Sequence, residues 1–176
     1  RGYDVNLFEQ RSNILCETSS INQYRVHSGY HYPRSFETAV QCKNSSTEFI
    51  NCFKQAILPN NGEYYYAISA KDSLVTPEQY IQFLEDVGLE YEITDNIINT
   101  SLTIKAKEFI YDPFKLKDIL KKRLFSSGVN LNLNKRVNLK DFDLSDFTLA
   151  ATYSKINEWI PLPELTQFEL CEKPVL

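Results

Sequence analysis

A carboxylate at the end of a short apolar run is the first side chain in this sequence whose type and position suggest chemistry. Residues 3–9 (YDVNLFE) alternate and then run apolar, which predicts a buried parallel strand that ends at Glu9. At the end of a strand in a nucleotide-binding fold, a carboxylate accepts hydrogen bonds from the ribose hydroxyls of an adenine dinucleotide. Glu9 is therefore a candidate ribose acceptor, although a carboxylate in that position can equally be a solvated charge.

The stretch that follows Glu9, as far as Arg34, concentrates side chains that can bind ligands. It is polar and irregular, rich in Ser, Asn and His, and punctuated by Gly29, which predicts a long loop. Loops of that length inside compact domains are usually functional. These residues can also have purely structural roles. The loop serines can satisfy backbone groups, Arg25 can form a surface ion pair, and His27 can be a hydrogen-bonded core histidine.

The sequence after the loop predicts helices and a strand, and these elements are expected to hold the loop in position. Residues 35–53 carry apolar side chains at helical spacing behind a serine N-cap, which predicts a helix or two. The aromatic and β-branched run EYYYAISA (63–70) predicts a strand. Thr76 followed by Pro77 is typical of a helix start, and Gly88 is expected to end that helix.

The second half of the chain mixes strands and helices in the same way. Residues 90–111 hold two alternating runs, which predict antiparallel, half-exposed strands. A helix is predicted from Asp112 until Gly128 stops it, followed by a short strand VNLNL and then KRVNL (129–139). The run DFTLAATYS (146–154) predicts a further strand that leads into a loop. Helices thus alternate with strands at both ends around a strand-rich middle, which indicates a nucleotide-binding α/β layer interrupted by a second lobe.

Residues 18–33 (TSSINQYRVHSGYHYP) carry the spacing T-S-x-x-N-x-x-x-x-H-x-G-x-x-Y and follow Glu9 at the distance seen in one flavoprotein superfamily. The segment resembles the D-amino-acid oxidase superfamily, and within it L-2-hydroxyglutarate dehydrogenase and its relatives. Ser35, Ala39 and Cys42 continue the likeness. Later stretches, in order, are similar to the start of the family's substrate lobe, its return into the FAD lobe and a strand leading toward the flavin: 66–89, 109–137 and 146–154.

The resemblance implies an α/β fold that contains part of a Rossmann-like FAD-binding lobe with an inserted antiparallel, strand-rich substrate lobe. Residues 1–58 would form the first part of the FAD-binding lobe, with its strand, cofactor loop and helices. Residues 59–111 would form part of the substrate lobe and residues 112–160 the return segment of the FAD-binding lobe. Residues 161–176 would be a tail or a truncated continuation.

The resemblance also implies FAD as the cofactor and assigns residues to it. Glu9 would hold the adenosine ribose, and the loop serines would face the pyrophosphate and the ribityl chain. Asn22 and Arg25 would lie near the phosphates or the flavin edge, while His27 and Gly29 would approach the isoalloxazine ring. The expected cofactor-binding residues are Glu9, Gln10, Arg11, Ser19, Ser20, Asn22, Arg25, His27, Gly29, Val137, Ala151 and Thr152.

The activity implied is that of an FAD-dependent oxidoreductase, a dehydrogenase or oxidase, which moves a hydride from a small amine or 2-hydroxy acid to the flavin. His27 or His31 would take the N–H or O–H proton, and Arg25 or Arg34 would pair with a substrate carboxylate, so Arg25, His27 and His31 are the candidate catalytic residues. The G-x-G-x-x-G turn that binds pyrophosphate would lie upstream of Arg1, and residues 160–176 lack the family's final glycine-rich FAD contact. We therefore expect weak FAD binding from these residues alone.

The composition argues against a nucleic-acid-binding protein, a metalloprotein and a membrane-spanning protein. The net charge is -4, from 23 acidic and 19 basic residues that are spread along the chain. The sequence therefore shows no basic cluster that would bind nucleic acid. Four cysteines without a C-x-x-C pair, and only two histidines, predict no metal site and reduced thiols in a cytoplasmic protein. N-x-S matches at Asn44 and Asn99 are expected by chance in such a sequence. No apolar run reaches the ~20 residues of a membrane span, so we expect a soluble protein.

Two other functions stay open. The first is a non-catalytic binding or structural protein built on an incomplete flavoprotein-like lobe, which the missing glycine-rich turn favours. The second is an NAD-linked enzyme, which shares the acidic residue at the strand end but whose catalytic apparatus has no counterpart here. The sequence leaves the substrate, the electron acceptor and the oligomeric state undetermined.

Overall fold

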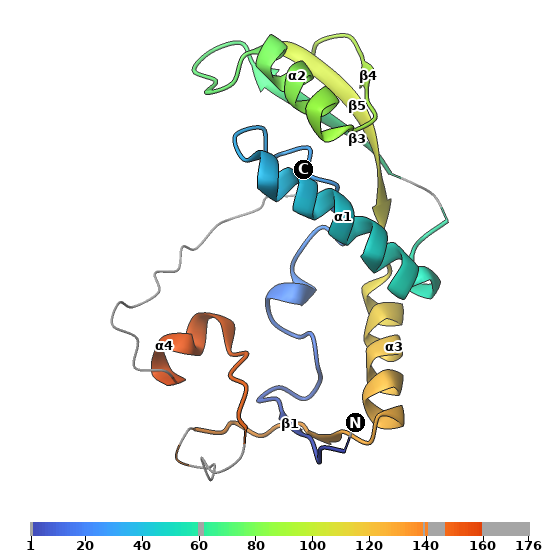
Figure 1. Cartoon of the computed structure of the whole chain (residues 1–176), viewed down its shortest axis with the longest axis vertical. Helices are drawn as coiled ribbons and strands as arrows, with labels where there is room; N and C mark the ends of the chain where they lie inside the picture. The colour runs from blue at the N-terminus through green and yellow to red at the C-terminus, as the bar shows by residue number, and fades with distance from the viewer. Residues whose placement is uncertain (1, 60–61, 139, 141–146, 160–176) are drawn as a thin grey trace.

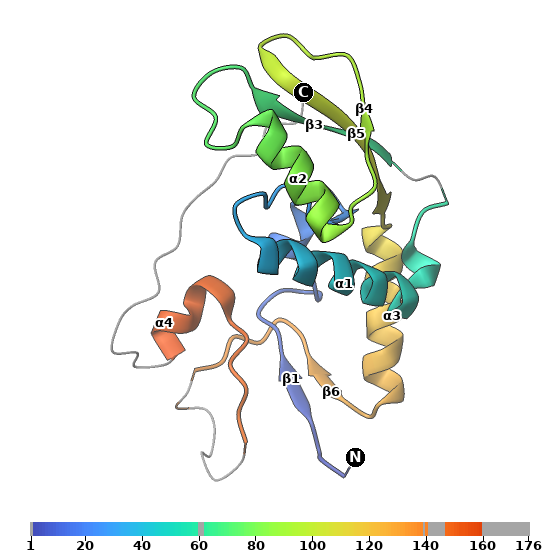
Figure 2. The ribbon, with the colours of Figure 1, turned by 45° about the horizontal axis from the view of Figure 1, so that its top comes forward.

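The computed structural model describes residues 2–59, 62–138, 140 and 147–159, and they form a mixed α/β structure with one parallel and one antiparallel sheet (Figure 1). The parallel sheet joins the first strand to a segment more than 120 residues later, because β1 (Asn6–Phe8) pairs with β6 (Asn130–Asn132). Figure 2 shows the two short strands side by side at the end of the molecule opposite the antiparallel sheet. The parallel strand predicted over residues 3–9 is confirmed, although it is shorter than expected.

The antiparallel sheet is centred on β5 (Thr100–Ile110). One edge of β5 pairs with β3 (Gly62–Ser69). The other edge pairs with two short strands, β4 (Glu92–Ile93) and β2 (Arg25–Val26). β2 belongs to the long loop of the sequence, so the sheet holds the end of that loop in place, and the predicted antiparallel middle of the chain is confirmed.

Four α-helices complete the described structure. They are α1 (Phe36–Cys52), α2 (Pro77–Val87), α3 (Pro113–Ser126) and the short α4 (Ile156–Trp159), with 3-10 turns at η1 (Thr18–Ser20), η2 (Lys54–Ala56) and η4 (Tyr153–Lys155). α2 lies against the antiparallel sheet, and α1 lies against α2 (Figures 1 and 2). α3 connects the end of β5 to β6 and so joins the two sheets.

Local sequence signals explain where these helices begin and end. The Thr76 hydroxyl accepts a hydrogen bond from the Gln79 amide at 3.3 Å, and the Gln79 side chain accepts one from the Thr76 amide at 2.9 Å, which is a complete capping box. Asp112 caps α3 by accepting from the amides of Phe114 and Lys115. Gly88 ends α2 in the left-handed conformation, with φ of 70°.

The core lies between α1, α2 and the antiparallel sheet. Leu84 and Ile104 are fully buried at its centre, and Ala39 brings α1 close to them. The cluster consists of Tyr30, Ala39, Ile68, Tyr80, Phe83, Leu84, Val87, Leu89, Leu102, Ile104 and Ala106. Because Tyr30 of the long loop is 3% exposed within this cluster, the core fixes the position of the loop as well as the helices.

The strand predicted over residues 146–154 is wrong for the part that the structure describes. Residues 147–152 form no strand, and Tyr153–Lys155 forms a 3-10 turn. Tyr153 has a φ of 48°, a left-handed backbone that an extended strand does not allow. Residue 146 and the expected tail 161–176 lie outside the described residues.

No helix among the described residues is long and apolar enough to cross a bilayer. Within the same residues, no group of three or more His, Cys, Asp or Glu side chains is placed to hold a metal ion, and Cys16, Cys42 and Cys52 are free thiols.

Candidate functional site

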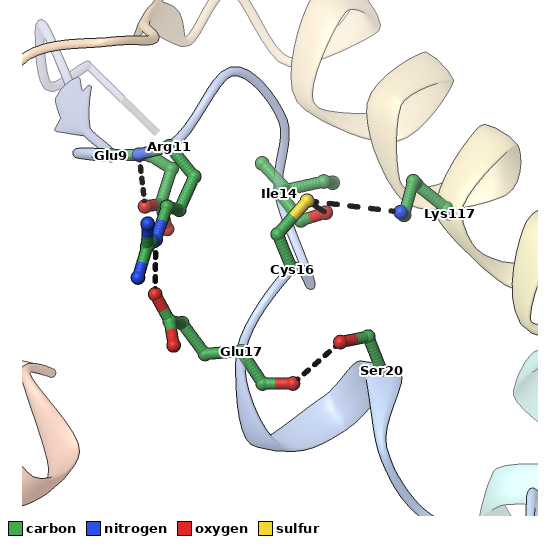
Figure 3. Close-up of polar contacts among 7 residues, drawn as sticks. All are labelled: Glu9, Arg11, Ile14, Cys16, Glu17, Ser20 and Lys117. Carbon is green, nitrogen blue, oxygen red and sulfur yellow. Dashed lines mark hydrogen bonds and ion pairs between the residues drawn. The ribbon is translucent and has the colours of Figure 1, made fainter.

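Glu9 lies at the carboxyl edge of the parallel sheet. Its amide donates to the carbonyl of Asn132 at 2.9 Å, and its carbonyl accepts from the amide of Lys135 at 2.9 Å, so the pairing of β1 and β6 continues past both strands. The half-buried carboxylate accepts a hydrogen bond from the Arg11 amide at 2.7 Å, which fixes its orientation (Figure 3). In open α/β sheets, ligands bind at this edge of the parallel strands.

A polar path leads from Glu9 to the 3-10 turn η1. The Arg11 guanidinium forms an ion pair with the Glu17 carboxylate, and the Ser20 hydroxyl donates to the Glu17 carbonyl at 2.7 Å (Figure 3). The hydrogen bond to Glu17 raises the pKa of Arg11 above its usual value. The Ser20 hydroxyl thus satisfies a loop carbonyl, while Ser19 and Gln10 are exposed, and the assignment of these three residues to the cofactor stays a prediction.

Arg25, on β2, is held inside the molecule. Its Nε lies 3.2 Å from Oε2 of Glu108, and only 12% of the Arg25 side chain is exposed. The guanidinium lies over the ring of Tyr64, 4.6 Å from its centroid, and 5.6 Å from the centroid of Tyr66. The expectation of a surface ion pair is wrong, because this ion pair is buried and flanked by aromatic rings.

Glu108 is the centre of this cluster and is not among the site residues expected from the sequence. One carboxylate oxygen accepts from the Ser28 amide at 2.7 Å, and the other accepts from the Tyr66 hydroxyl at 2.6 Å. Burial, and then the hydrogen bond to Glu108, raise the pKa of Tyr66 far above its usual value. The alternation of the strand could have revealed the burial of Glu108. This residue lies two and four positions after the buried residues Ala106 and Ile104 of β5, so its side chain points to the same, inward face.

The two histidines lie beside this cluster, on the surface. Their rings meet edge to face with centroids 4.7 Å apart, and His31 is stacked 6.2 Å from Tyr66. Both histidines are exposed, so the interpretation of His27 as a core histidine is wrong. The three candidate catalytic residues therefore form a chain of neighbours, since Tyr66 lies beside both Arg25 and His31, and His31 lies beside His27.

Two further loop residues, Gly29 and Asn22, hold the loop against neighbouring elements. Gly29 has a φ of 104°, and a Cβ there would lie 2.7 Å from the Ala39 carbonyl oxygen, so the close approach that it permits is toward α1. The Asn22 side chain accepts hydrogen bonds from the Tyr24 amide at 2.7 Å and the Tyr111 hydroxyl at 3.4 Å. These contacts hold the segment between η1 and β2 against the end of β5.

The remaining expected cofactor residues lie after β6. Val137 is half-buried and Ala151 is exposed. The hydroxyl of Thr152 is buried and has no hydrogen-bond partner among the described residues. The same holds for Nε of Arg25, which lies close to Glu108 but whose N–H is not aligned for a hydrogen bond. Buried polar atoms are normally satisfied, so the Thr152 hydroxyl is a site where a bound ligand can supply the missing partner, whereas Arg25 already has the Glu108 carboxylate as its counter-charge.

The structure thus brings the expected residues together in two groups. The first group follows the polar path of Glu9, Arg11 and Ser20 at the edge of the parallel sheet. The second gathers Arg25 with the two histidines at the end of the antiparallel sheet. The backbone of residues 21–24 connects the two groups, and the segment just after β6 adjoins the first group through the hydrogen bond from the Lys135 amide to the Glu9 carbonyl.

Comparison with known proteins gives three relatives, all named as FAD-dependent monooxygenases. FPY4 of Fusarium mangiferae is 33% identical over 92 residues, which are 51% of this chain and 24% of the relative. The protein kojA of Aspergillus flavus and its probable counterpart in Aspergillus oryzae are each 25% identical over 150 residues, or 78% of this chain and 34% of the relative.

The chain therefore spans about a quarter to a third of the length of these relatives. No family model matches it. No solved structure matches it either. The relatives support FAD as the cofactor and an FAD-dependent oxidoreductase as the class of protein.

Proposed function

We propose that this chain is part of an FAD-dependent oxidoreductase of the D-amino-acid oxidase superfamily, nearest to its L-2-hydroxyglutarate dehydrogenase-like members. The observation that supports FAD and the oxidoreductase class is the shared naming of three relatives as FAD-dependent, over as much as 78% of the chain. The proposed reaction is hydride transfer from a small amine or 2-hydroxy acid. The resemblance of residues 18–33 supports this finer assignment.

Two features of the described residues support FAD binding. The Glu9 carboxylate lies at the carboxyl edge of a parallel pair, where ribose hydroxyls can donate to it. Thr152 offers a buried hydroxyl without a hydrogen-bond partner among the described residues. When bound, FAD supplies the hydride acceptor, and the protein supplies binding, orientation and electrostatics.

The proposed roles follow from the two groups of residues. Glu9 binds the adenosine ribose, and the backbone near η1 faces the phosphates. His27 or His31 takes the substrate proton, since both imidazoles are exposed and so accessible to a substrate. Arg25 contributes a positive charge fixed in position by Glu108. The proposed lobes are 1–58 and 112–160 for FAD and 59–111 for the substrate, so the second group lies where they meet.

Two alternatives differ in chemistry. The names of the relatives favour a monooxygenase, which adds an oxygen atom from O₂ to its substrate. A non-catalytic binding or structural protein built on an incomplete flavoprotein-like lobe is the other alternative. Anaerobic mixing with 2-hydroxy acids or amines discriminates among them: a dehydrogenase or oxidase bleaches its flavin with substrate alone, a monooxygenase requires a separate reductant, and a binding protein shows neither reaction.

The cofactor assignment is tested by replacing the carboxylate of Glu9. Glu9→Ala should weaken FAD binding roughly ten- to a hundredfold, because a charge-assisted hydrogen bond is worth about 1.5–3 kcal/mol. Flavin fluorescence titration measures the dissociation constant. Glu48→Ala, at an exposed position on α1, is the matched control and should leave binding unchanged. Equal FAD affinity in Glu9→Ala and the unsubstituted chain would show that the nucleotide does not bind at this strand edge.

A further inference from the structure

A cavity lies between the long loop that follows Glu9 and the helices α1 and α3. Its volume is about 380 Å³, within the range of roughly 300–1,000 Å³ that small-molecule sites occupy. Its aromatic wall is continuous: the ring centroids of Tyr24 and Tyr111 are 5.8 Å apart, and those of Phe49 and Tyr111 are 5.5 Å apart. Phe53 extends the wall, with its centroid 4.9 Å from that of Phe49. A planar apolar ring suits such a surface.

One charged side chain faces this apolar wall. Of the described residues that line the cavity, Lys117 on α3 is the one that carries a charge. Its ammonium lies 4.0 Å from the Cys16 thiol (Figure 3), and it forms no ion pair within the described part of the chain. The acidic neighbours of Lys117 in the sequence, Asp112 and Asp118, do not line the cavity. The charge of the site is therefore positive and complementary to an anion.

Local hydrogen bonds hold the Tyr24 part of the wall that the loop forms. Leu15 and Tyr24 both line the cavity in left-handed conformations, with φ of 53° and 52°. Bulky residues rarely adopt this conformation unless their surroundings impose it. The Tyr24 hydroxyl donates to the Ser20 carbonyl at 2.7 Å, and its amide donates to the Asn22 side chain at 2.7 Å. A wall fixed in this way loses little freedom when a ligand binds.

We propose that this cavity binds a small planar aromatic carboxylate, with its ring against the aromatic wall and its carboxylate on Lys117. Ser19 and Ser20, which are among the proposed cofactor residues, also line this cavity, so it adjoins the proposed FAD site. It goes beyond the proposed function, because ligand binding there needs no flavin. A carboxylate bound to an ammonium at a partly buried position adds the attraction of opposite charges to the hydrogen bond, which a neutral carbonyl acceptor lacks.

Calorimetric titration of the chain with 2-naphthoate tests the proposal, with the neutral 2-naphthamide as the matched ligand. Naphthoate should bind at least about tenfold more tightly than naphthamide. Lys117→Met should remove most of that preference while leaving naphthamide binding unchanged. Lys122→Met, at an exposed position on the same helix, should retain it. Phe114→Ala, at the mouth of the cavity, should weaken both ligands.

Three results would overturn the proposal. The first is no binding of either ligand, and the second is equal affinity for the two ligands. The third is displacement of naphthoate by saturating FAD, which would make the cavity part of the cofactor site. Failure of FAD to bind at all would count against the proposed function and leave the naphthoate result intact. Far-UV circular dichroism identifies a Lys117→Met chain that has not folded, and the ratio of the two ligand affinities in the unsubstituted chain then remains the deciding measurement.

Discussion

Replacing the buried carboxylate of Glu108 should be the most damaging single polar substitution in the described part of the chain. Glu108 is 1% exposed and accepts hydrogen bonds from the Ser28 amide and the Tyr66 hydroxyl, while Arg25 lies 3.2 Å away. In Glu108→Ala, both donors lose their acceptor, and a guanidinium that is 12% exposed remains without its counter-charge. Unpaired buried charges cost far more than the net stabilisation of the pair.

The magnitude follows from these contacts. Removing one partner of a buried ion pair typically costs about 3–5 kcal/mol, which is a large share of the roughly 5–15 kcal/mol of a whole domain. Glu108→Gln keeps the shape and one acceptor oxygen, so we expect a smaller loss of about 1–3 kcal/mol. Adding Arg25→Met to Glu108→Gln should cost less than the sum of the two single losses, because the unpaired charge disappears with the second substitution.

Urea unfolding followed by far-UV circular dichroism gives these free energies. Hydrogen exchange provides a local readout, since the Ser28 amide should exchange faster in Glu108→Gln than in the unsubstituted chain. Glu92→Gln, on an exposed edge strand, is the matched control and should change stability by less than about 0.5 kcal/mol. A loss below about 1 kcal/mol in Glu108→Ala, or strict additivity in the double variant, would refute the buried network as the anchor of the loop.

Three more outcomes are expected. Gly29→Ala should destabilise the chain by about 1–3 kcal/mol more than Gly128→Ala in urea unfolding, because both positions have positive φ but only at Gly29 would the new Cβ meet backbone, at 2.7 Å. Thr76→Ala should lose about 1 kcal/mol through its broken capping box, while Thr76→Ser should not. Burial raises the pKa of Tyr30 to about 12 and that of Tyr66 upward, so the unfolded chain releases protons first and stability should fall as pH rises from 10 toward 12. Tyr66→Phe should reduce that pH dependence; an unchanged slope would count against the buried tyrosines as its source.

Local features of the fold were predictable because they depend on neighbours in the sequence. The helix that follows Thr76 begins and ends where its capping signals place it, since a capping box uses residues three positions apart. Alternation predicted the antiparallel strand from residue 100 to residue 110, because side chains in a strand point to opposite faces in turn. The strand predicted over 146–154 failed because composition does not reveal the left-handed backbone at Tyr153.

Of the candidate site, the sequence by itself determined Glu9 at the end of the first strand, and the loop that carries the histidines. Only the tertiary structure decided which side chains those residues meet. Ser28 and Glu108 are 80 positions apart, and Lys117 lies 101 positions from Cys16. No local pattern encodes such pairs; they form because β2 pairs with the far end of β5 and α3 then starts beside the loop. Burial of a charge beside its partner, like the closure of a cavity, is a property of packed surfaces, so it exists only once distant segments have come together.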